Sequence, residues 1–510
     1  MKLLILPIIL PVLAGVWIYL HPFRDGRSRQ VFTLAAVLLN TAVIALLCIH
    51  AYPSAAGSSA ASVPVLQLLH LAEKVELKLK LDGLGILFLA LIAFLWPLAA
   101  SYAFEYMEKE HSKARFFAFY TVSYGVTAGV ALSGNLITMY LFYELMTLAT
   151  VTLVAHEDDV RGTRAARKYI VYSIGGAALS FVGITILLSQ GQTGDFAYGG
   201  LSDAASAFAP SERRRLLAAY LLMFFGFGVK AAIFPLHGWL PSASVAPTPV
   251  TALLHAVAVV KSGVFASVRA AFYVFGPAFL TGTYAQTAAI IVAGITVIYG
   301  SGMALKEQHL KRRLAYSTVS NLSYILLGMA FLTESGLQAG ISHMLFHGLM
   351  KITLFFCAGA VMCKTGREYV GQMEGLGRKM PVTFITFTVA SLALTGAPLL
   401  PGFISKMNLL KEAAALATDS SAAGTAVGAA ALFGIIALVI SALLTAAYLL
   451  PLCVRAFLMP LNSGSPAPVF TDCDRDPGPR MTVPFVILCA AMLVTGFSSG
   501  WLMDLLEALL

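Results

Sequence analysis

Phe225 to Arg269 reads FGFGVKAAIFPLHGWLPSASVAPTPVTALLHAVAVVKSGVFASVR, two apolar segments joined by a proline-rich elbow. Each segment carries one lysine, Lys230 or Lys261, and two histidines, His237 and His255, lie between them. A lysine at the centre of a membrane helix costs about 2.5–3.5 kcal/mol on insertion scales. Two such lysines in one helical hairpin therefore indicate a function, and proton handling is the function that we expect.

The composition predicts an all-α membrane protein with almost no soluble part. Of the 510 residues, 58% are hydrophobic and only 12% are charged, whereas soluble domains carry roughly 25% charged residues. A span needs about 20 apolar residues, so the chain has room for about 14 transmembrane helices. The basic residues Arg24, Arg27 and Arg29 follow the first apolar run. A cleaved signal would have basic residues in front, so we expect Met1–Leu20 to be a retained span.

Apolar runs place the spans along the chain, and two of the runs are too long for straight helices. The predicted spans are 3–20, 31–50, 82–104, 115–133, 135–155, 167–189, 216–236, 248–275, 286–305, 312–332, 340–363, 383–413, 428–458 and 483–509. The twelfth run, 383–413, also contains Pro398 and Pro401. Because proline interrupts a helix, we expect span 12 to be broken.

Basic loops predict the orientation. Lysine and arginine gather after spans 1, 3, 5, 9 and 11, and are missing from the loops after spans 4, 8 and 10. Basic loops stay in the cytoplasm, so both termini are expected on the outer face of a cell membrane. Two loops depart from this pattern, one with Lys74, Lys78 and Lys80 and the other with Arg213–Arg215. In such a chain the net charge of +9 indicates topology and not nucleic-acid binding.

The two proline-interrupted spans suggest an inverted repeat. Lys230 precedes Pro235 in span 7, and Lys406 follows Pro401 in span 12, five spans later. An odd number of spans inverts the second copy, and broken helices at matching places in inverted halves point to an ion site near the midplane. The predicted units are 1–114 (helices 1–3), 115–275 (first repeat, helices 4–8), 286–458 (second repeat, helices 9–13) and 483–510 (helix 14).

Glu144 is the only acid in the apolar run 135–155, and Lys230 is its expected partner. Burial favours the neutral amine, and a nearby carboxylate favours the ammonium. Movement of Glu144 would therefore make Lys230 hold or release a proton, although a structural ion pair stays open as the alternative. Lys261 is the next expected carrier. Arg269, about two turns further along, is a candidate for snorkelling to an interface instead.

His343, His347 and Lys351 recur every four residues in span 11. This spacing places them on one stripe of a helix about 12 Å long, which predicts a polar path toward Lys406, the expected terminal proton carrier. His255, in an apolar helix, is a stronger candidate for the path than His237. For His237, just beyond Pro235, proton uptake and a capping role both stay open.

No metal or redox cofactor is expected. A pair of histidines four residues apart can bind a metal, but no carboxylate or thiol shares the face of His343 and His347. The six cysteines form no Cys-x-x-Cys pair, so neither a zinc nor an iron–sulfur site is supported. No signature for a nicotinamide or a flavin is present. Any redox chemistry is therefore expected in other subunits, and the chain alone is not expected to be a catalyst.

Several segments resemble one family closely. They are FYELM around Glu144, GVKAAIFPLHGWLPSASVAPTPVTALLHAVAVVKSGVF (228–265), LKRRLAYSTVSNLSYILLGM (310–329), HMLFHGLMKITLFFCAGAV (343–361) and PGFISK (401–406). From about residue 80 to 460, the chain resembles the antiporter-like, proton-translocating subunits of respiratory complex I, Mrp-type cation/proton antiporters and membrane-bound hydrogenases. The departure is His309, where the family often has Asp before Leu-Lys-Arg.

The resemblance implies 14 helices, two inverted five-helix halves and a hydrophilic axis along the membrane midplane. It also implies that Glu144 and Lys230 form the family's glutamate–lysine pair, that Lys261 is its central lysine and that Lys406 is its terminal lysine. His343 and His347 fall in its connecting region. The branch of the family stays open.

We therefore expect a proton-translocating subunit of a complex I-like, hydrogenase or Mrp complex, with other membrane subunits as partners. The ion is H⁺, with Na⁺ left open, and the drive is a redox reaction or a sodium flux in a neighbouring subunit. Two alternatives are a self-sufficient secondary transporter for a solute or cation and a quinone-site subunit of an oxidoreductase.

Overall fold

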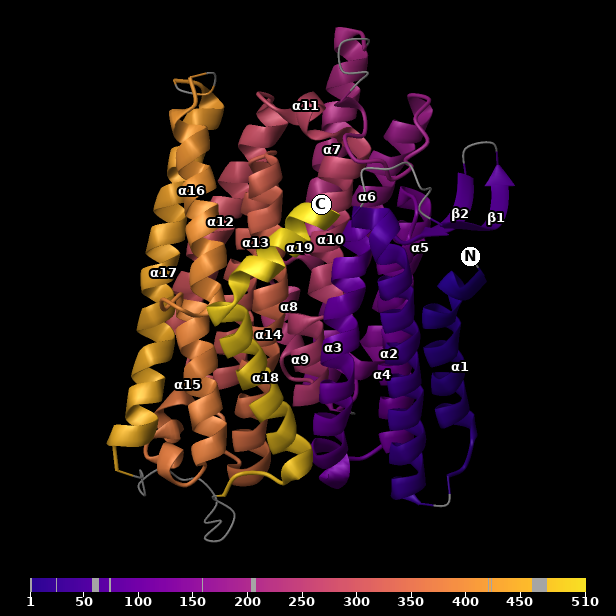
Figure 1. Cartoon of the computed structure of the whole chain (residues 1–510). Helices are drawn as coiled ribbons and strands as arrows, with labels where there is room; N and C mark the ends of the chain where they lie inside the picture. The colour runs from indigo at the N-terminus through magenta and orange to yellow at the C-terminus, as the bar shows by residue number, and fades with distance from the viewer. Residues whose placement is uncertain are drawn as a thin grey trace.

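A computed structural model describes residues 2–23, 25–56, 64–72, 75–157, 159–202, 208–420, 422, 424–460 and 475–510. Arg24, Lys74 and Cys473, which belong to the patterns discussed above, lie outside the described residues. The helices stand side by side in a single bundle, with most axes running from one face to the other (Figure 1).

The described elements follow the predicted apolar runs closely. In chain order they are α1 (Leu6–Leu20), α2 (Gly26–Ala56), β1 (Val65–Ala72), β2 (Val75–Lys80), α3 (Gly83–Tyr106), α4 (Lys113–Leu132), α5 (Leu136–Val154), α6 (Val160–Ser189), α7 (Pro210–Lys230), α8 (Trp239–Ala243), α9 (Thr248–Ala256), α10 (Val259–Val268), a π-helical turn (Arg269–Phe275), α11 (Pro277–Leu280), α12 (Tyr284–Lys306), α13 (Leu310–Ala330), α14 (Glu334–Thr365), α15 (Pro381–Thr395), α16 (Pro401–Thr418), α17 (Ala426–Leu458), α18 (Pro479–Phe497) and α19 (Ser499–Leu509).

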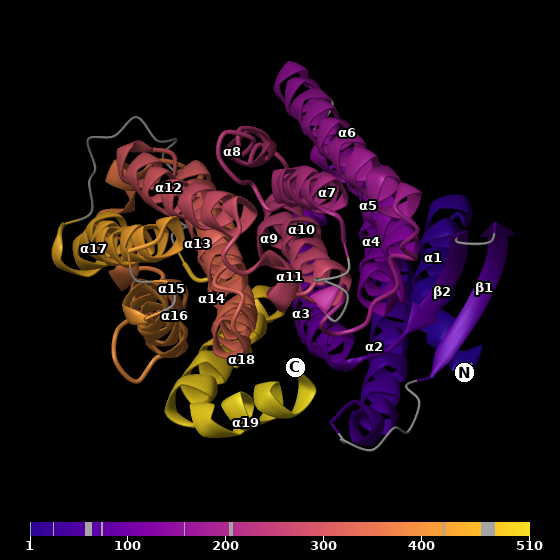
Figure 2. The same cartoon turned by 90° about the horizontal axis from the view of Figure 1, so that it is seen from above.

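Burial separates the helices into an outer and an inner set. Among the described residues, ten helices are long and apolar enough to cross a membrane, which confirms the predicted helical membrane protein. The most apolar stretch of α2 is only 28% buried, whereas that of Thr248–Phe275 is 100% buried and that of α14 is 94% buried. Seen from above, α14 lies between α12–α17 on one side and α3, α9 and α10 on the other (Figure 2). The segments that carry Lys261 and the polar stripe of α14 are therefore the most deeply buried of these ten.

Side-chain caps fix where two of the spanning helices begin. Asp82 accepts a hydrogen bond at 3.0 Å from the backbone nitrogen of Gly85, and Asn135 accepts one at 2.9 Å from that of Thr138. Such caps satisfy backbone N–H groups that the first helical turn leaves free. The predicted starts at residues 82 and 135 coincide with these caps.

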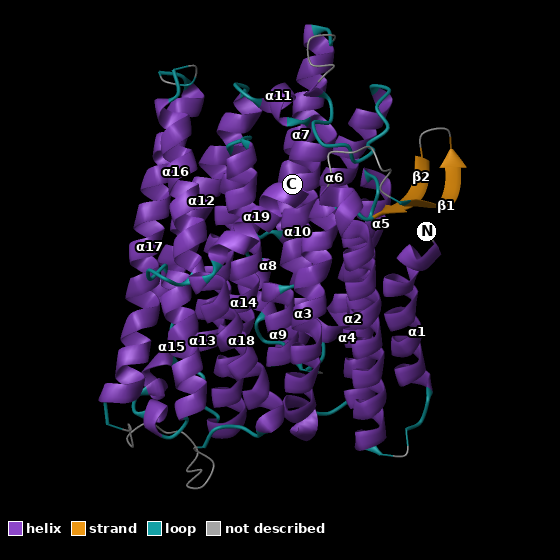
Figure 3. Cartoon of the chain, in the orientation of Figure 1, coloured by secondary structure: helices purple, strands orange, loops and turns teal. Residues whose placement is uncertain are grey.

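A β-hairpin corrects the all-α prediction. Strands β1 and β2 pair antiparallel at one edge of the bundle (Figure 3). Residues 75–80, VELKLK, alternate apolar and polar residues, the period of a strand with one covered face. The sequence prediction used the lysines only as loop charges. Lys78 forms an ion pair of 2.6 Å with Asp195, and its carbonyl accepts a 2.9 Å hydrogen bond from the backbone of Gly134, so the hairpin packs on the start of α5.

Spans 7 and 12 are interrupted near the predicted prolines. Helix α7 ends at Lys230 and the chain turns before α8. Helix α15 ends at Thr395, and α16 restarts with Pro401 in its first turn. A methyl group at Gly402 would lie 1.9 Å from the carbonyl oxygen of Ala393, so only glycine allows this close approach at the second break.

Two further breaks correct the predicted helices 8 and 14. Span 248–275 divides into α9 and α10 at Val257–Ala258, where the backbone amides of both residues bond to the carbonyl of Leu253. Span 483–509 divides into α18 and α19 at Ser498, beside a glycine- and serine-rich stretch of low helix propensity. Helix α19 then runs obliquely across the bundle toward α3 (Figure 1), and a methyl group at Gly83 would meet the carbonyl of Leu509.

Arg269 does not reach an interface, so the snorkelling interpretation is wrong. Its side chain is fully buried, and its two terminal nitrogens each donate a 2.6 Å hydrogen bond to a carboxylate oxygen of Asp82. The rings of Phe196, Phe265 and Tyr273 lie 4.5–4.9 Å from the guanidinium carbon. A two-point ion pair between the start of α3 and the end of span 8 therefore compensates this charge.

We expect Asp82→Ala to lower the free energy of unfolding by about 3–5 kcal/mol, because it leaves a buried guanidinium without a counter-charge. The measurement is the thermal midpoint of the purified protein in detergent. Asp82→Asn keeps the capping oxygen and removes only the charge, and Asp82→Ala with Arg269→Met removes both charges. If the ion pair matters, Asp82→Asn is destabilised and the double variant recovers stability; an unchanged midpoint in Asp82→Asn would rule it out.

Candidate functional site

Glu144 and Lys230 lie in contact at the break of span 7. Lys230 is the last residue of α7 and fully buried, and its Nζ lies 3.8 Å from Oε1 of Glu144 on α5. The ammonium instead donates to the carbonyl oxygen of Tyr143 and lies 3.4 Å from the centre of the Tyr143 ring. At 3.8 Å the ion pair is too long for a hydrogen bond, so a small shift can close or open it.

Lys261 occupies the centre of the bundle on α10 and is fully buried. Its Nζ lies 2.8 Å from Nδ1 of His347 on α14. A methyl group at Gly263 would lie 2.5 Å from the backbone nitrogen of Ala231, so α10 runs directly against the end of α7 that carries Lys230. The structure therefore packs the helix that carries Lys261 against the end of α7 at Lys230.

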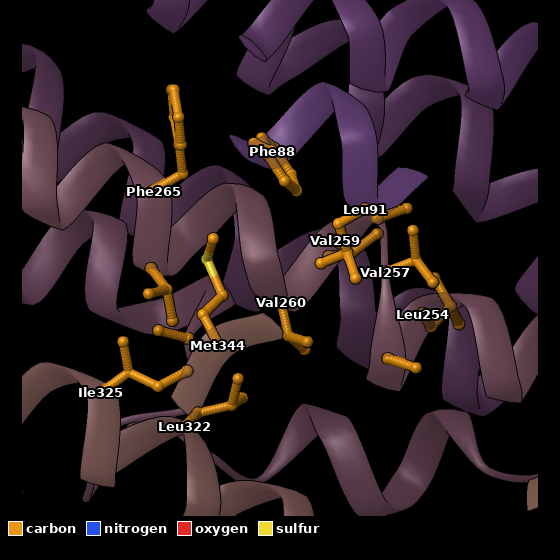
Figure 4. Packing of buried hydrophobic residues seen from close by; sticks show 14 of the residues in the cluster. Phe88, Leu91, Leu254, Val257, Val259, Val260, Phe265, Leu322, Ile325 and Met344 are labelled. Carbon is orange, nitrogen blue, oxygen red and sulfur yellow. The ribbon is translucent and has the colours of Figure 1, made fainter. Parts of the chain in front are cut away.

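The surroundings of Lys261 are apolar. Val259 and Val260, which precede Lys261 on α10, belong to a cluster of buried hydrophobic residues with Leu91 of α3 and Met344 of α14 (Figure 4). Rings of Phe88 and Phe265 stack at 5.0 Å. In such a medium, a charge is stabilised only by the few polar groups that reach it, so His347 is the main partner of the Lys261 amine.

The predicted stripe on α14 contributes to a row of polar groups. We call this row, which contains Lys261, His347, His343, Ser405 and Lys406, the polar line. His343 shares hydrogen bonds with Ser405 on α16 at 2.9 Å and with Asn321 on α13 at 3.3 Å. The rings of His343 and His347 stack with centres 6.0 Å apart. Lys351 donates to the carbonyl of Leu314 at 3.0 Å and to the hydroxyl of Ser317. All three stripe residues are fully buried.

Lys406 lies at the second helix break. Its Nζ donates to the carbonyls of Leu394 at 2.6 Å and Thr395 at 3.2 Å, which the end of α15 leaves free. The ring of Tyr324 lies 5.3 Å from this nitrogen and 5.2 Å from the ring of His343. A cavity of about 160 Å³, lined by Lys406, Tyr324 and Gly396 among others, opens beside the amine. This volume is large enough for several waters.

The two remaining histidines differ in position. His255 on α9 is fully buried against the ring of Phe355 at 4.7 Å, and neither of its ring nitrogens has a hydrogen-bond partner within the described part of the chain. His237 follows α7, is 8% exposed, and its ring contacts are Phe234 and Tyr299. The structure thus places His255 with the central groups and His237 apart from them.

Sequence reasoning missed the neutral partners of the line. Asn321, Ser405, Ser317 and Tyr324 hold or flank His343, Lys351 and Lys406 through the contacts given above. Asn321 and Ser317 lie in the apolar run 312–332, and Ser405 directly precedes Lys406. Neutral polar residues beside intramembrane charges are the signal that could have identified them.

The family now follows from comparison with known proteins. Residues 133–447 match the family described as NADH:quinone oxidoreductase/Mrp antiporter, transmembrane, and residues 70–117 match the N-terminus of NADH-ubiquinone oxidoreductase (complex I) chain 5. The chain belongs to the NADH:quinone oxidoreductase/Mrp antiporter family. This confirms the resemblance predicted from the sequence motifs. The matched segment of this antiporter family contains Glu144, Lys230, Lys261 and Lys406, together with the polar stripe on α14.

Curated relatives of this antiporter family differ in length. NADH-quinone oxidoreductase subunit N of Desulforudis audaxviator is 31% identical over 436 residues, which cover 82% of each chain. A probable K(+)/H(+) antiporter subunit of Rhizobium meliloti is 35% identical over 339 residues, 66% of this chain but only 33% of that protein. The chain thus spans about a third of the longer relative.

The fold of the family is also found in a solved assembly. A chain of the membrane-bound sulfane sulfur reductase, an archaeal respiratory membrane complex, superposes with a TM-score of 0.83 at 22% identity. The alignment covers 100% of this chain and 97% of that one. The whole described bundle is therefore of the same architecture.

Proposed function

We propose that the chain is a proton-translocating membrane subunit of a multisubunit complex. The observation that carries this proposal is the set of buried contacts from Lys261 through His347 and His343 to Ser405, the residue before Lys406. Relatives named as subunits of NADH-quinone oxidoreductase and of cation/proton antiporters support it. The transported ion is H⁺ in this proposal, and the partners are the other membrane subunits.

The proposed architecture has 14 transmembrane helices in two inverted halves. The halves are 115–275 and 286–458, preceded by helices 1–3 in 1–114 and followed by helix 14 in 483–510. The two breaks beside Lys230 and Lys406 support the inversion, since each lies at a matching place in its half. Both termini lie on the outer face of the cell membrane in this proposal, and the loops after odd-numbered spans face the cytoplasm.

Glu144 and Lys230 act as the switch. When the Glu144 carboxylate is close, it stabilises the ammonium form of Lys230. When the carboxylate moves away, burial favours the neutral amine. When both are protonated, the ammonium groups of Lys230 and Lys261 repel each other. The protein interior screens this repulsion less than water would. Adding a proton to Lys230 or removing one from it therefore changes the free energy of protonating Lys261.

The remaining groups carry the proton along the midplane. Protons reach the line from the cytoplasmic side near α8 and α9, where His237 and His255 lie. They pass from Lys261 to His347 and His343, with Lys351 as a neighbouring charge, and leave through Lys406 and the cavity beside it. The drive is a redox reaction or an opposing cation flux in neighbouring subunits.

The test is proton movement by the assembled complex in sealed vesicles, followed with an interior pH dye and abolished by a protonophore. We expect movement only while the driving reaction of the complex runs, and none from the chain reconstituted alone. Sodium-driven or solute-driven transport by the chain alone would contradict the proposal and favour a self-sufficient secondary transporter. Loss of electron transfer on quinone-competitive labelling of these helices would favour a quinone-site subunit instead.

A further inference from the structure

Lys311 is a buried lysine that the relay described above does not use. It lies in the first turn of α13 and is 8% exposed, although Lys306 only five positions earlier is exposed. A cation in the first turn opposes the helix dipole, so the position does not stabilise α13 electrostatically. Its Nζ donates a 3.0 Å hydrogen bond to the carbonyl of Ala246, in the proline-rich elbow before α9.

Three carboxylates from three different loops surround Lys311. Glu110, Glu157 and Glu368 lie within electrostatic range of its ammonium, on the loops that follow α3, α5 and α14. In the described part of the chain, none of them comes within the 4.0 Å of an ion pair with it. The three acids lie on loops that also carry basic residues, on the side that the basic loops predict to be cytoplasmic, and their charges favour the ammonium form of Lys311.

Two of these carboxylates have unequal proton affinities. His309 lies 3.3 Å from Glu368, and its hydrogen bond lowers the pKa of that carboxyl. Burial, and then the charge of Glu110, raise the pKa of Glu157. Glu157 therefore holds a proton more readily than Glu368 does. His309 thus holds the carboxylate of Glu368 near the start of α13, two positions before Lys311.

On its inner side, Lys311 connects with His255. The carbonyl of Ala246 also accepts a 3.0 Å hydrogen bond from the hydroxyl of Thr251. Thr251 and His255 lie four residues apart on α9, hence on one face of that helix. Both ring nitrogens of His255 lack a partner among the described residues, and the charges of Lys311 and Lys351 both act on this ring. His255 therefore lies between Lys311 and the central line.

We propose that Lys311 is the cytoplasmic uptake residue of the relay, a role that rests on the proposed function. The neutral amine of Lys311 takes a proton from water held among Glu110, Glu157 and Glu368. The ammonium then gives that proton to a ring nitrogen of His255 by way of water and the Thr251 hydroxyl, and returns to its neutral state. The chain thereby takes up protons through the elbow before α9 and not through His237.

The test uses substitutions that separate charge from proton release. Arginine keeps the positive charge but is not deprotonated in proteins, so Lys311→Arg preserves a structural role and blocks transfer. We expect Lys311→Arg and Lys311→Met to assemble and to slow coupled proton movement by about 10²-fold, the contribution of a positioned acid–base group. Lys306→Arg and Lys306→Met, at the exposed lysine nearby, are the matched controls and retain the wild-type rate.

Wild-type proton movement in Lys311→Arg would overturn the inference, and loss of movement in His237→Leu at the same time would place uptake at His237. If neither Lys311 variant assembles, Thr251→Val takes their place: slowed movement supports the route and an unchanged rate overturns it. Lys230→Ala in the same vesicles keeps the two proposals apart. Unchanged movement there overturns the proposed function, whereas loss there with normal Lys311→Arg overturns only the uptake residue.

Discussion

Replacing Lys230 with Ala is expected to abolish coupled proton movement while the complex still assembles. The substitution removes the cation that lies 3.8 Å from Glu144 and that donates to the Tyr143 carbonyl. In the proposed mechanism, the switch then has no proton left to hold or release. Assembly survives because Ala at the end of α7 takes a costly ammonium out of a buried site, and Glu144, 28% exposed, is free to take up a proton.

The size of the effect follows from the role. We expect the contribution of this subunit to coupled proton movement to fall by more than about 10²-fold. The control is Lys364→Ala, which breaks another lysine–glutamate pair, 3.1 Å from Lys364 Nζ to Glu105 Oε1, at the end of α14. Normal pumping by Lys230→Ala, with Lys364→Ala also normal, would contradict the proposed function and leave the Glu144–Lys230 pair as a structural ion pair.

The ionisable groups of the site could be predicted from the sequence because a charge in an apolar run is costly and therefore conspicuous. Lys230, Lys261, Lys351 and Lys406 are visible on this ground alone, and the four-residue spacing of the α14 stripe places its members on one face. The breaks after Lys230 and before Lys406 carry prolines nearby, so they too were predictable. In each case, a single residue type or a short spacing in the sequence is enough to predict the feature.

What the sequence did not predict depends on contacts between distant segments. Arg269 forms an ion pair with Asp82, which lies 187 positions away in the chain, and no local pattern predicts that partner. The interruption of span 8 at Val257–Ala258 carries neither proline nor glycine. Local propensity therefore does not predict this break, and we attribute it to packing. The alternation of VELKLK indicates a strand, which the interpretation of its lysines as loop charges overlooks.

Replacing Lys406 with Ala is the second change with a large expected effect. Lys406 is the last ionisable group of the line and lies beside the cavity of about 160 Å³. In the proposed path, a proton on His343 then has only Ser405 and Tyr324 as neighbours beyond it among the described residues, so transfer stops there. We expect coupled proton movement to fall by more than about 10²-fold, with normal amounts of assembled complex in the membrane.

Lys411→Ala is the matched control on the same helix, since Lys411 is exposed and lies five positions further along α16. The Leu394 and Thr395 carbonyls lose their donor in Lys406→Ala, so the thermal midpoint of the complex is measured beside the rate. A normal midpoint with no pumping identifies a proton carrier. A wild-type rate would remove Lys406 from the path, and a lowered midpoint with proportional loss of rate would make its role structural.

The central claim is that the groups from Glu144 to Lys406 form one path. The measurement is the number of protons moved per turnover of the driving reaction in sealed vesicles that contain Lys230→Ala, Lys406→Ala or both. Changes along one path are not additive, whereas independent sites add. We predict that the contribution of this subunit is lost completely in each single variant and that the double variant loses no more. Partial losses in the single variants that add up in the double variant would contradict a single path.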